Sequence, residues 1–320
     1  MAVSSILAVL ALTLYFFERY PSRGKRVEEP TMHDAPTQHA PLLVPRALVS
    51  QLMRLYDFAH PLRRGRLIRG YDRAHAIRTA RMCAAVASAL GHQPDRVRQY
   101  QIACLLHDLG RAGLDRPLFG KIWSWAKAHG IPTRPREWRA IHPETTYGRE
   151  TEAFIARYGQ ALAADGILIT PWAKEQIEMR LGYARRLARR LRVVRSSIAR
   201  MGVRWESWMQ AVMLYYYYPE KLARARPWVK ELAEVLVACE QFEAYSNQQR
   251  GRDYYARKKE TIAEAFAYLE KLEREGILSA RVMKTLKRLA ASGRFDSIIA
   301  AARGSRLTTR ERRFLHRMER

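Results

Sequence analysis

The pair His107 and Asp108 is the feature of this sequence best suited to chemistry. It stands at the end of an otherwise apolar segment, LLHDLG. An imidazole and a carboxylate are costly to bury at the end of an apolar helix unless something pairs with them. A divalent ion supplies that pairing, and this ligand combination suits Mn, Fe, Ni or Zn better than Ca. The sequence therefore predicts a metal site centred on His107 and Asp108. A capped helix end with a surface ion pair is the alternative.

Other segments must complete the ligand shell, because adjacent helical residues point about 100° apart. The available candidates are His75 and Glu240. Glu240 lies in the apolar segment VLVACEQF, where burial of its carboxylate requires a partner. His142 stands in a His-Pro-Glu sequence that also indicates a helix break, so its ligand role and a structural role both stay open.

The order of these residues resembles the H…HD…D pattern of the HD superfamily of metal-dependent phosphohydrolases. The HD-GYP branch, the bacterial cyclic di-GMP phosphodiesterases, is more similar still. LLHDLGRAGL resembles its LLHDIGKIGI-like segment, REWRAIHPETTYG its EExxxIxxHPxxG segment, and VLVACEQFEAYS its ILAVADxFDALT segment. The similarity covers about residues 70 to 155 and 205 to 290.

The resemblance implies a site residue by residue. His75, His107, Asp108 and Glu240 would hold one metal ion, with Asp108 bridging to a second ion bound by His142. Asp108 would be catalytic, and Arg111, which replaces the branch's Lys, would neutralise the substrate phosphate.

One segment departs from the branch. The branch has a His-His pair followed by the GYP loop. At that place this sequence has four tyrosines, Tyr215 to Tyr218, followed by Pro219 and Glu220. Two metal ligands are therefore missing, and the expected site is complete for one ion only. We expect the tyrosines to pack in the core or to form a wall for base stacking, since a neutral phenol is a poor ligand.

The elements that position these residues are predicted to be helices. From residue 47 onward apolar residues recur every three or four positions, and no alternating strand with a hairpin turn is recognisable. Gly91, Gly110, Gly166 and Gly276 are expected helix ends. The prediction is an all-α HD-domain helical bundle over residues 47–295, with a basic helical insertion at 158–205 and a basic C-terminal tail at 296–320.

The N-terminal region is predicted to be a membrane anchor. Residues 2–17 carry no charge, and positive residues follow the apolar run instead of preceding it as in a cleaved signal peptide. We expect a single-pass helix at 1–20, a proline-rich linker at 21–46, and the remainder in the cytoplasm at the inner membrane. A buried N-terminal helix is the alternative.

The charge predicts a phosphate-rich partner. Lys and Arg number 57 against 31 Asp and Glu, a formal net charge of +26. The predicted basic helix 173–201 has no acidic residue after Glu178, which favours contact with an anionic membrane. A nucleic acid or a solvated face paired with acidic groups elsewhere are the alternatives.

The remaining residues of reactive type are expected to be structural. Cys83, Cys104 and Cys239 are far apart and odd in number, which is typical of buried thiols in a reducing compartment. His60, His92, His129 and His316 show no ligand spacing and are expected at the surface.

Three functions are carried forward. The first is a membrane-tethered HD phosphohydrolase that acts on cyclic di-GMP or another nucleotide. The second is a degenerate HD-GYP-like domain that binds a nucleotide or a protein without turnover, as a signalling module. The third and weakest is a nucleic-acid-binding protein. Assembly as a homodimer stays open for each.

Overall fold

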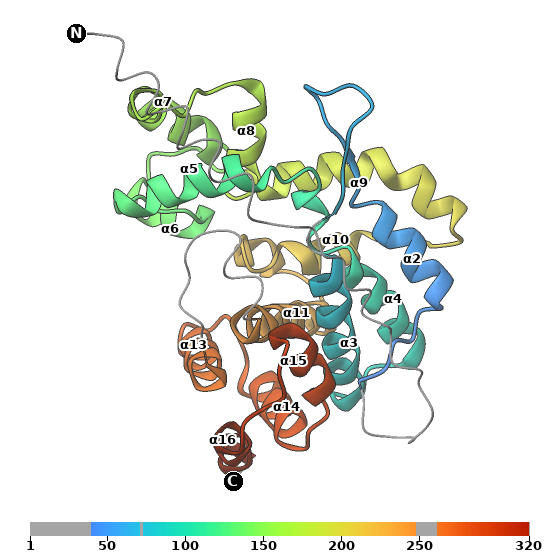
Figure 1. Cartoon of the computed structure of the whole chain (residues 1–320). Helices are drawn as coiled ribbons and strands as arrows, with labels where there is room; N and C mark the ends of the chain where they lie inside the picture. The colour runs from blue at the N-terminus through green and yellow to red at the C-terminus, as the bar shows by residue number, and fades with distance from the viewer. Residues whose placement is uncertain (1–39, 71–72, 248–260, 320) are drawn as a thin grey trace, which may run out of the picture. The chain divides into compact units, whose positions relative to one another are not determined.

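The computed structural model describes residues 40–70, 73–247 and 261–319, which are almost entirely helical (Figure 1). The elements are α2 Arg46–Arg54, β1 Phe58–Ala59, β2 Leu67–Ile68, α3 Arg73–Ala89, α4 Pro94–Leu105, η1 Leu109–Arg111, α5 Arg116–Ala128, α6 Pro135–Ile141, α7 Glu150–Ala164, α8 Pro171–Glu178, α9 Tyr183–Arg200, α10 Ser207–Leu214, η2 Pro219–Leu222, α11 Pro227–Ser246, α13 Ile262–Arg274, α14 Ala280–Ala291, α15 Asp296–Arg303 and α16 Thr309–Glu319. β1 and β2 form one short antiparallel hairpin. The predicted all-α class is confirmed.

The expected anchor at 1–20 and most of the expected linker lie outside the described residues. In the part of the chain that is described, no helix is long and apolar enough to cross a membrane. The end of the expected linker is packed: Ala40 and Val44 are buried. The Gln101 side-chain oxygen accepts from the backbone N–H groups of Leu43 at 2.7 Å and Val44 at 3.1 Å. The folded region therefore begins before residue 47.

Glycines end several helices as predicted, with one exception that matters for the site. Gly91, Gly166 and Gly276 follow α3, α7 and α13 with φ values of 88°, 71° and 71°, where a side chain would be strained. Gly110 does not end a helix, because α4 already stops at Leu105. A Cβ at Gly110 would lie 2.6 Å from the Tyr183 ring. Its lack of a side chain permits close packing.

The main hydrophobic core is formed by α2, α3, α4, α9, α10, α11 and α13–α16. α3 packs against both α4 and α11, and Figure 1 shows these helices side by side. The basic C-terminal tail expected at 296–320 is instead folded into this core. Ile298, Ile299 and Leu315 are buried in this core, so α15 and α16 are part of the fold.

A second hydrophobic core is formed by residues between Leu114 and Leu181, on α5, α6, α7 and α8. Trp123, Trp138 and Phe154 lie at its centre, with Trp123 and Trp138 each about 6 Å from the Phe154 ring (5.6 and 5.9 Å between centroids). The expected insertion at 158–205 does not coincide with this unit. The second core begins earlier, and α9 belongs to the main core.

The predicted basic helix 173–201 is two helices. α8 ends at Glu178, and α9 begins at Tyr183. Gly182 lies between them, where a Cβ would come within 2.4 Å of the Glu178 Cγ. The hydrophobic period continues through both helices, so the sequence pattern alone could not separate them.

Candidate metal centre

His107 and Asp108 lie in the turn that follows α4, and this turn is fixed by side chains from other elements. The Tyr56 hydroxyl donates to the Leu105 carbonyl at 2.8 Å, and the Tyr183 hydroxyl donates to the His107 carbonyl. Carbonyls at a helix end have no partner within their own helix, and buried ones require another donor. The two phenols supply the donors, so the position of His107 depends on α9 as well as α4.

Three predicted ligands converge. His75 in the first turn of α3, His107 and Asp108 each offer one ligand atom, and these atoms all lie within 4.8 Å of one another. The Nε2 atoms of both imidazoles are 3.8 Å from the Asp108 Oδ2. The side chains are 3%, 6% and 4% exposed, so the group is shielded from solvent. Ligands about 2.0–2.2 Å from an ion lie about 3–4 Å apart. The two distances of 3.8 Å between an imidazole nitrogen and the Asp108 oxygen fit ligands of one divalent ion.

The outward nitrogen of each imidazole is already bonded, which orients the other toward the shared point. His75 Nδ1 contacts the Glu243 carboxylate, and His107 Nδ1 is 2.7 Å from the Cys104 carbonyl. Within the described residues, neither Nε2 has a hydrogen-bond partner, although both are buried. Metal-binding histidines typically show this arrangement, with a carboxylate or carbonyl behind the ring. The residues present therefore fit a divalent ion.

Glu243 was not predicted as a site residue. It is 1% exposed on α11, and its Oε1 accepts from Arg78 Nε at 2.7 Å and from Asn247 Nδ2 at 3.2 Å. Its position three residues after Glu240 in the apolar segment was the available signal. Both carboxylates required a partner, and only the packing of α11 against α3 shows that Glu243 is the one that contacts His75.

Arg111 is close to Asp108 in this structure. Its Nη1 is 3.2 Å from the Asp108 Oδ2, and its Nη2 donates to the Tyr217 hydroxyl at 3.2 Å. Burial raises the pKa of Tyr217 above its usual value, and burial with the charge of Asp108 raises that of Tyr183. Both phenols are therefore neutral donors and acceptors at physiological pH. Arg111 neutralises the ligand carboxylate here, where the resemblance implies contact with a phosphate.

Glu240 and His142 are not brought into the group of three. Glu240 lines the same cavity of about 20 Å³ as His107 and Asp108, and its Oε2 accepts from Gln241 Nε2 at 2.5 Å. His142 follows α6, with its ring 4.3 Å from that of Trp138 in the second core and its Nδ1 3.6 Å from a Glu144 oxygen. The structure thus assembles three of the five predicted ligands.

The other residues of reactive type are mostly where they were expected. Cys83, Cys104 and Cys239 are buried and free. Tyr215 and Tyr218 are buried in the main core, whereas Tyr216 and Tyr217 border cavities. His92 differs: its side chain is only 6% exposed, and its Nε2 is 2.8 Å from a Glu231 oxygen. Burial lowers the pKa of His92, and its contact with Glu231 on α11 is a tertiary feature that local spacing does not reveal.

Known proteins offer no closer guide to this arrangement. No protein-family model matches the chain, and neither a curated protein nor a solved structure is significantly similar to it. The resemblance to the HD superfamily rests on the quoted motifs alone, and the geometry of His75, His107 and Asp108 stands independently of it.

Proposed function

We propose that this chain is a metal-dependent phosphohydrolase that acts on a nucleotide phosphoester, with cyclic di-GMP as one substrate to test. One observation carries the proposal: His75, His107 and Asp108 present unbonded imidazole nitrogens and a carboxylate oxygen to one buried point. Two imidazoles and one carboxylate form a ligand set common to hydrolytic and oxidative metal sites. Mn, Fe, Ni and Zn all suit it.

The residues around the group have separate roles in this proposal. Glu243 holds the His75 ring, and the Cys104 carbonyl holds that of His107. The bound ion would lower the pKa of a water and stabilise charge on the phosphoryl oxygens. Hydrolysis would join the water oxygen to phosphorus, break the bridging P–O bond and return the proton to the leaving oxygen, with His75, His107 and Asp108 holding the ion. Arg111 would turn from Asp108 to a phosphoryl oxygen, a contact that guanidinium groups favour.

A second function is favoured by one specific observation. The cavity beside His107 and Asp108 measures about 20 Å³, enough for one water or ion but not for a phosphate group. Tyr216 and Tyr217 are among the residues that line it. A domain that retains the ion but admits no substrate would serve as a nucleotide-binding or protein-interaction signalling module.

The proposed setting is the cytoplasmic face of the inner membrane, with residues 1–20 as anchor. The apolar run at 2–17 and the net charge of +26 support it. An anionic membrane surface remains the proposed partner, and the basic segment 173–201 is one candidate surface for this contact. Homodimer formation and nucleic-acid binding are left to experiment.

The test is metal content and turnover of the full chain. We expect about one Mn or Fe per chain after loading, and release of linear product from cyclic di-GMP or of phosphate from another nucleotide. His107→Ala removes one ligand and should abolish both signals. His316→Ala replaces an exposed histidine and is the matched control. Bound metal without turnover of any nucleotide would support the signalling module. No bound metal in the wild-type chain would contradict both functions.

A further inference from the structure

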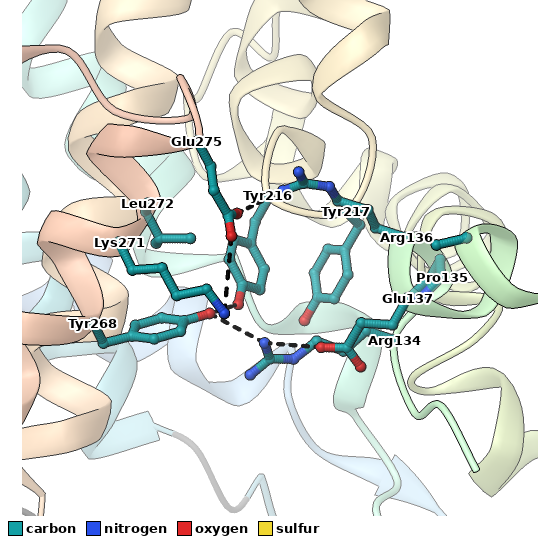
Figure 2. A pocket seen from close by; sticks show the side chains of 11 residues that line it. Arg134, Pro135, Arg136, Glu137, Tyr216, Tyr217, Tyr268, Lys271, Leu272 and Glu275 are labelled. Atoms are coloured by element: carbon teal, nitrogen blue, oxygen red, sulfur yellow. Dashed lines mark hydrogen bonds and ion pairs between the residues drawn. The ribbon is translucent and has the colours of Figure 1, made fainter. Parts of the chain in front are cut away.

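A larger pocket shares Tyr216 and Tyr217 with the small cavity beside His107 and Asp108. It has a volume of about 230 Å³ and opens between α6 and α13. Figure 2 shows Tyr268 and Lys271 of α13 facing Arg134 and Glu137 at the start of α6, with Tyr216 and Tyr217 between them. The pocket lies between the two hydrophobic cores. Its α13 wall belongs to the main core, and its α6 wall belongs to the second core.

Three tyrosines, Tyr216, Tyr217 and Tyr268, contribute aromatic rings to the lining of this pocket. The hydroxyls of Tyr216 and Tyr268 share a hydrogen bond at 2.6 Å, and Arg134 Nη1 donates to the Tyr268 hydroxyl at 3.1 Å. Burial raises the pKa of Tyr216 well above its usual value, so its phenol stays neutral. Neutral phenol rings stack on planar heteroaromatic rings and donate hydrogen bonds to their edges. The pocket thus suits a nucleobase.

The rim of the pocket is basic and loosely paired. Arg134, Arg136 and Lys271 face two carboxylates, Glu137 and Glu275. The contacts are Arg134–Glu137 at 3.4 Å, Arg136–Glu275 at 3.3 Å and Lys271–Glu275 at 3.8 Å. Strong charge-assisted hydrogen bonds are about 2.7–2.9 Å long, so these pairs are weak and exposed to solvent. A phosphate can replace either carboxylate as the partner of a guanidinium.

The pocket and the metal centre share a wall. Tyr216 and Tyr217 line both the larger pocket and the small cavity beside His107 and Asp108. Tyr217 also accepts the hydrogen bond from Arg111, which pairs with Asp108. A ligand in the larger pocket would therefore contact the same two phenol rings that line the cavity beside His107 and Asp108.

We propose that the pocket between α6 and α13 binds a mononucleotide, with its base against Tyr216 and Tyr268 and its phosphate at Arg134 and Arg136. This rests on the proposed function and deepens it, since Tyr217 is then the side chain that must move for the phosphoester to reach the metal centre. Pockets for drug-sized ligands measure about 300–1,000 Å³. A volume of about 230 Å³ accommodates one base, so a cyclic dinucleotide would place only one of its two bases in this pocket.

The test is binding of GMP, AMP, CMP and UMP to the metal-stripped full chain, measured by calorimetry. We expect at least one to bind, and Tyr268→Ala and Arg134→Ala each to weaken that binding about tenfold or more. Tyr268→Phe keeps the ring and should retain most of the affinity. Tyr147→Ala and Arg192→Ala change exposed residues outside the pocket and should bind as the wild type does.

The outcomes separate this proposal from the proposed function. Mononucleotide binding that persists in His107→Ala while metal is lost supports the pocket irrespective of hydrolysis. Absence of binding by all four mononucleotides overturns the pocket, even if metal and turnover are found. Equal affinity in wild type, Tyr268→Ala and Arg134→Ala overturns it as well. Circular dichroism and thermal unfolding of each variant show that the fold is kept.

Discussion

Two arginine-rich regions of this molecule use their charge in opposite ways. On α9, Arg186 is 1% exposed, donates to the Gly110 and Ala112 carbonyls at 2.7 Å each, and pairs with Glu175. In the β1–β2 hairpin, four exposed arginines carry no side-chain ion pair or hydrogen bond to any described residue: Arg63, Arg64, Arg66 and Arg69.

The difference shows that a count of basic residues does not locate a binding surface. The predicted membrane contact was placed on segment 173–201 because it is rich in arginine. In the structure, the first half of α9 directs its guanidinium groups to acidic residues of α7 and α8 and to carbonyls of the metal-centre turn. These include Arg185 with Glu152 and Arg189 with Glu178. The hairpin arginines have no such partners among the described residues, so they are the better placed for an anionic partner.

The largest effect is expected for Arg186→Ala. It leaves the buried Gly110 and Ala112 carbonyls without the Arg186 donor, while Glu175 keeps Arg189 at 3.0 Å, so the free energy of unfolding should fall by about 2–4 kcal/mol. Urea denaturation followed by circular dichroism measures this. Because these carbonyls lie two and four residues after Asp108, in the turn that positions it, metal affinity should fall too. Arg192→Ala, on the exposed side of the same helix, should change stability by less than about 0.5 kcal/mol. A loss below about 1 kcal/mol for Arg186→Ala would remove the distinction between the regions.

An intermediate effect is expected when Arg63 and Arg64 are both replaced by alanine. Each basic residue near an anionic bilayer contributes about 1 kcal/mol, so affinity for anionic vesicles should fall about 30-fold. The measurement is sedimentation of the full chain with phosphatidylglycerol vesicles, relative to neutral vesicles, which cancels any contribution of residues 1–20. Stability should not change. If replacing Arg192 and Arg195 on α9 lowers vesicle affinity more than replacing Arg63 and Arg64 does, the membrane contact lies on the basic segment 173–201 as predicted from the sequence.

The smallest effect is expected for Arg185→Ala. Its guanidinium makes two bonds to Glu152 at 3.0 and 2.9 Å, but both side chains are 34% exposed. Solvent screens such a pair, so the loss of unfolding free energy should be about 0.5 kcal/mol and should shrink in high salt. Thermal unfolding at low and high salt tests this. A cost that equals that of Arg186→Ala would show that burial does not separate the two arginines.

Local pattern was sufficient for part of the fold and of the site. The three- and four-residue spacing correctly predicted helices. The motif order also correctly paired His75 with His107, because α3 and α4, which position them, pack in the same core. Glu240 and Glu243 are one helical turn apart, and the rotation of α11 in the core decides which one contacts His75. The His142 ring packs against Trp138 of the second core. A local His-Pro-Glu pattern predicts a helix break but does not predict this tertiary contact. The same holds for the partners of Arg186.

The contact of Gly110 with Tyr183 has a consequence for finding relatives of this chain. Because the turn after Asp108 leaves no space for a Cβ beside the Tyr183 ring, the two positions are constrained jointly. A homologue with a side chain at the first must carry a smaller residue at the second, and must then hold the His107 carbonyl by another donor. In an alignment of candidate homologues, covariation between positions 110 and 183 would identify distant relatives whose overall sequence identity is low.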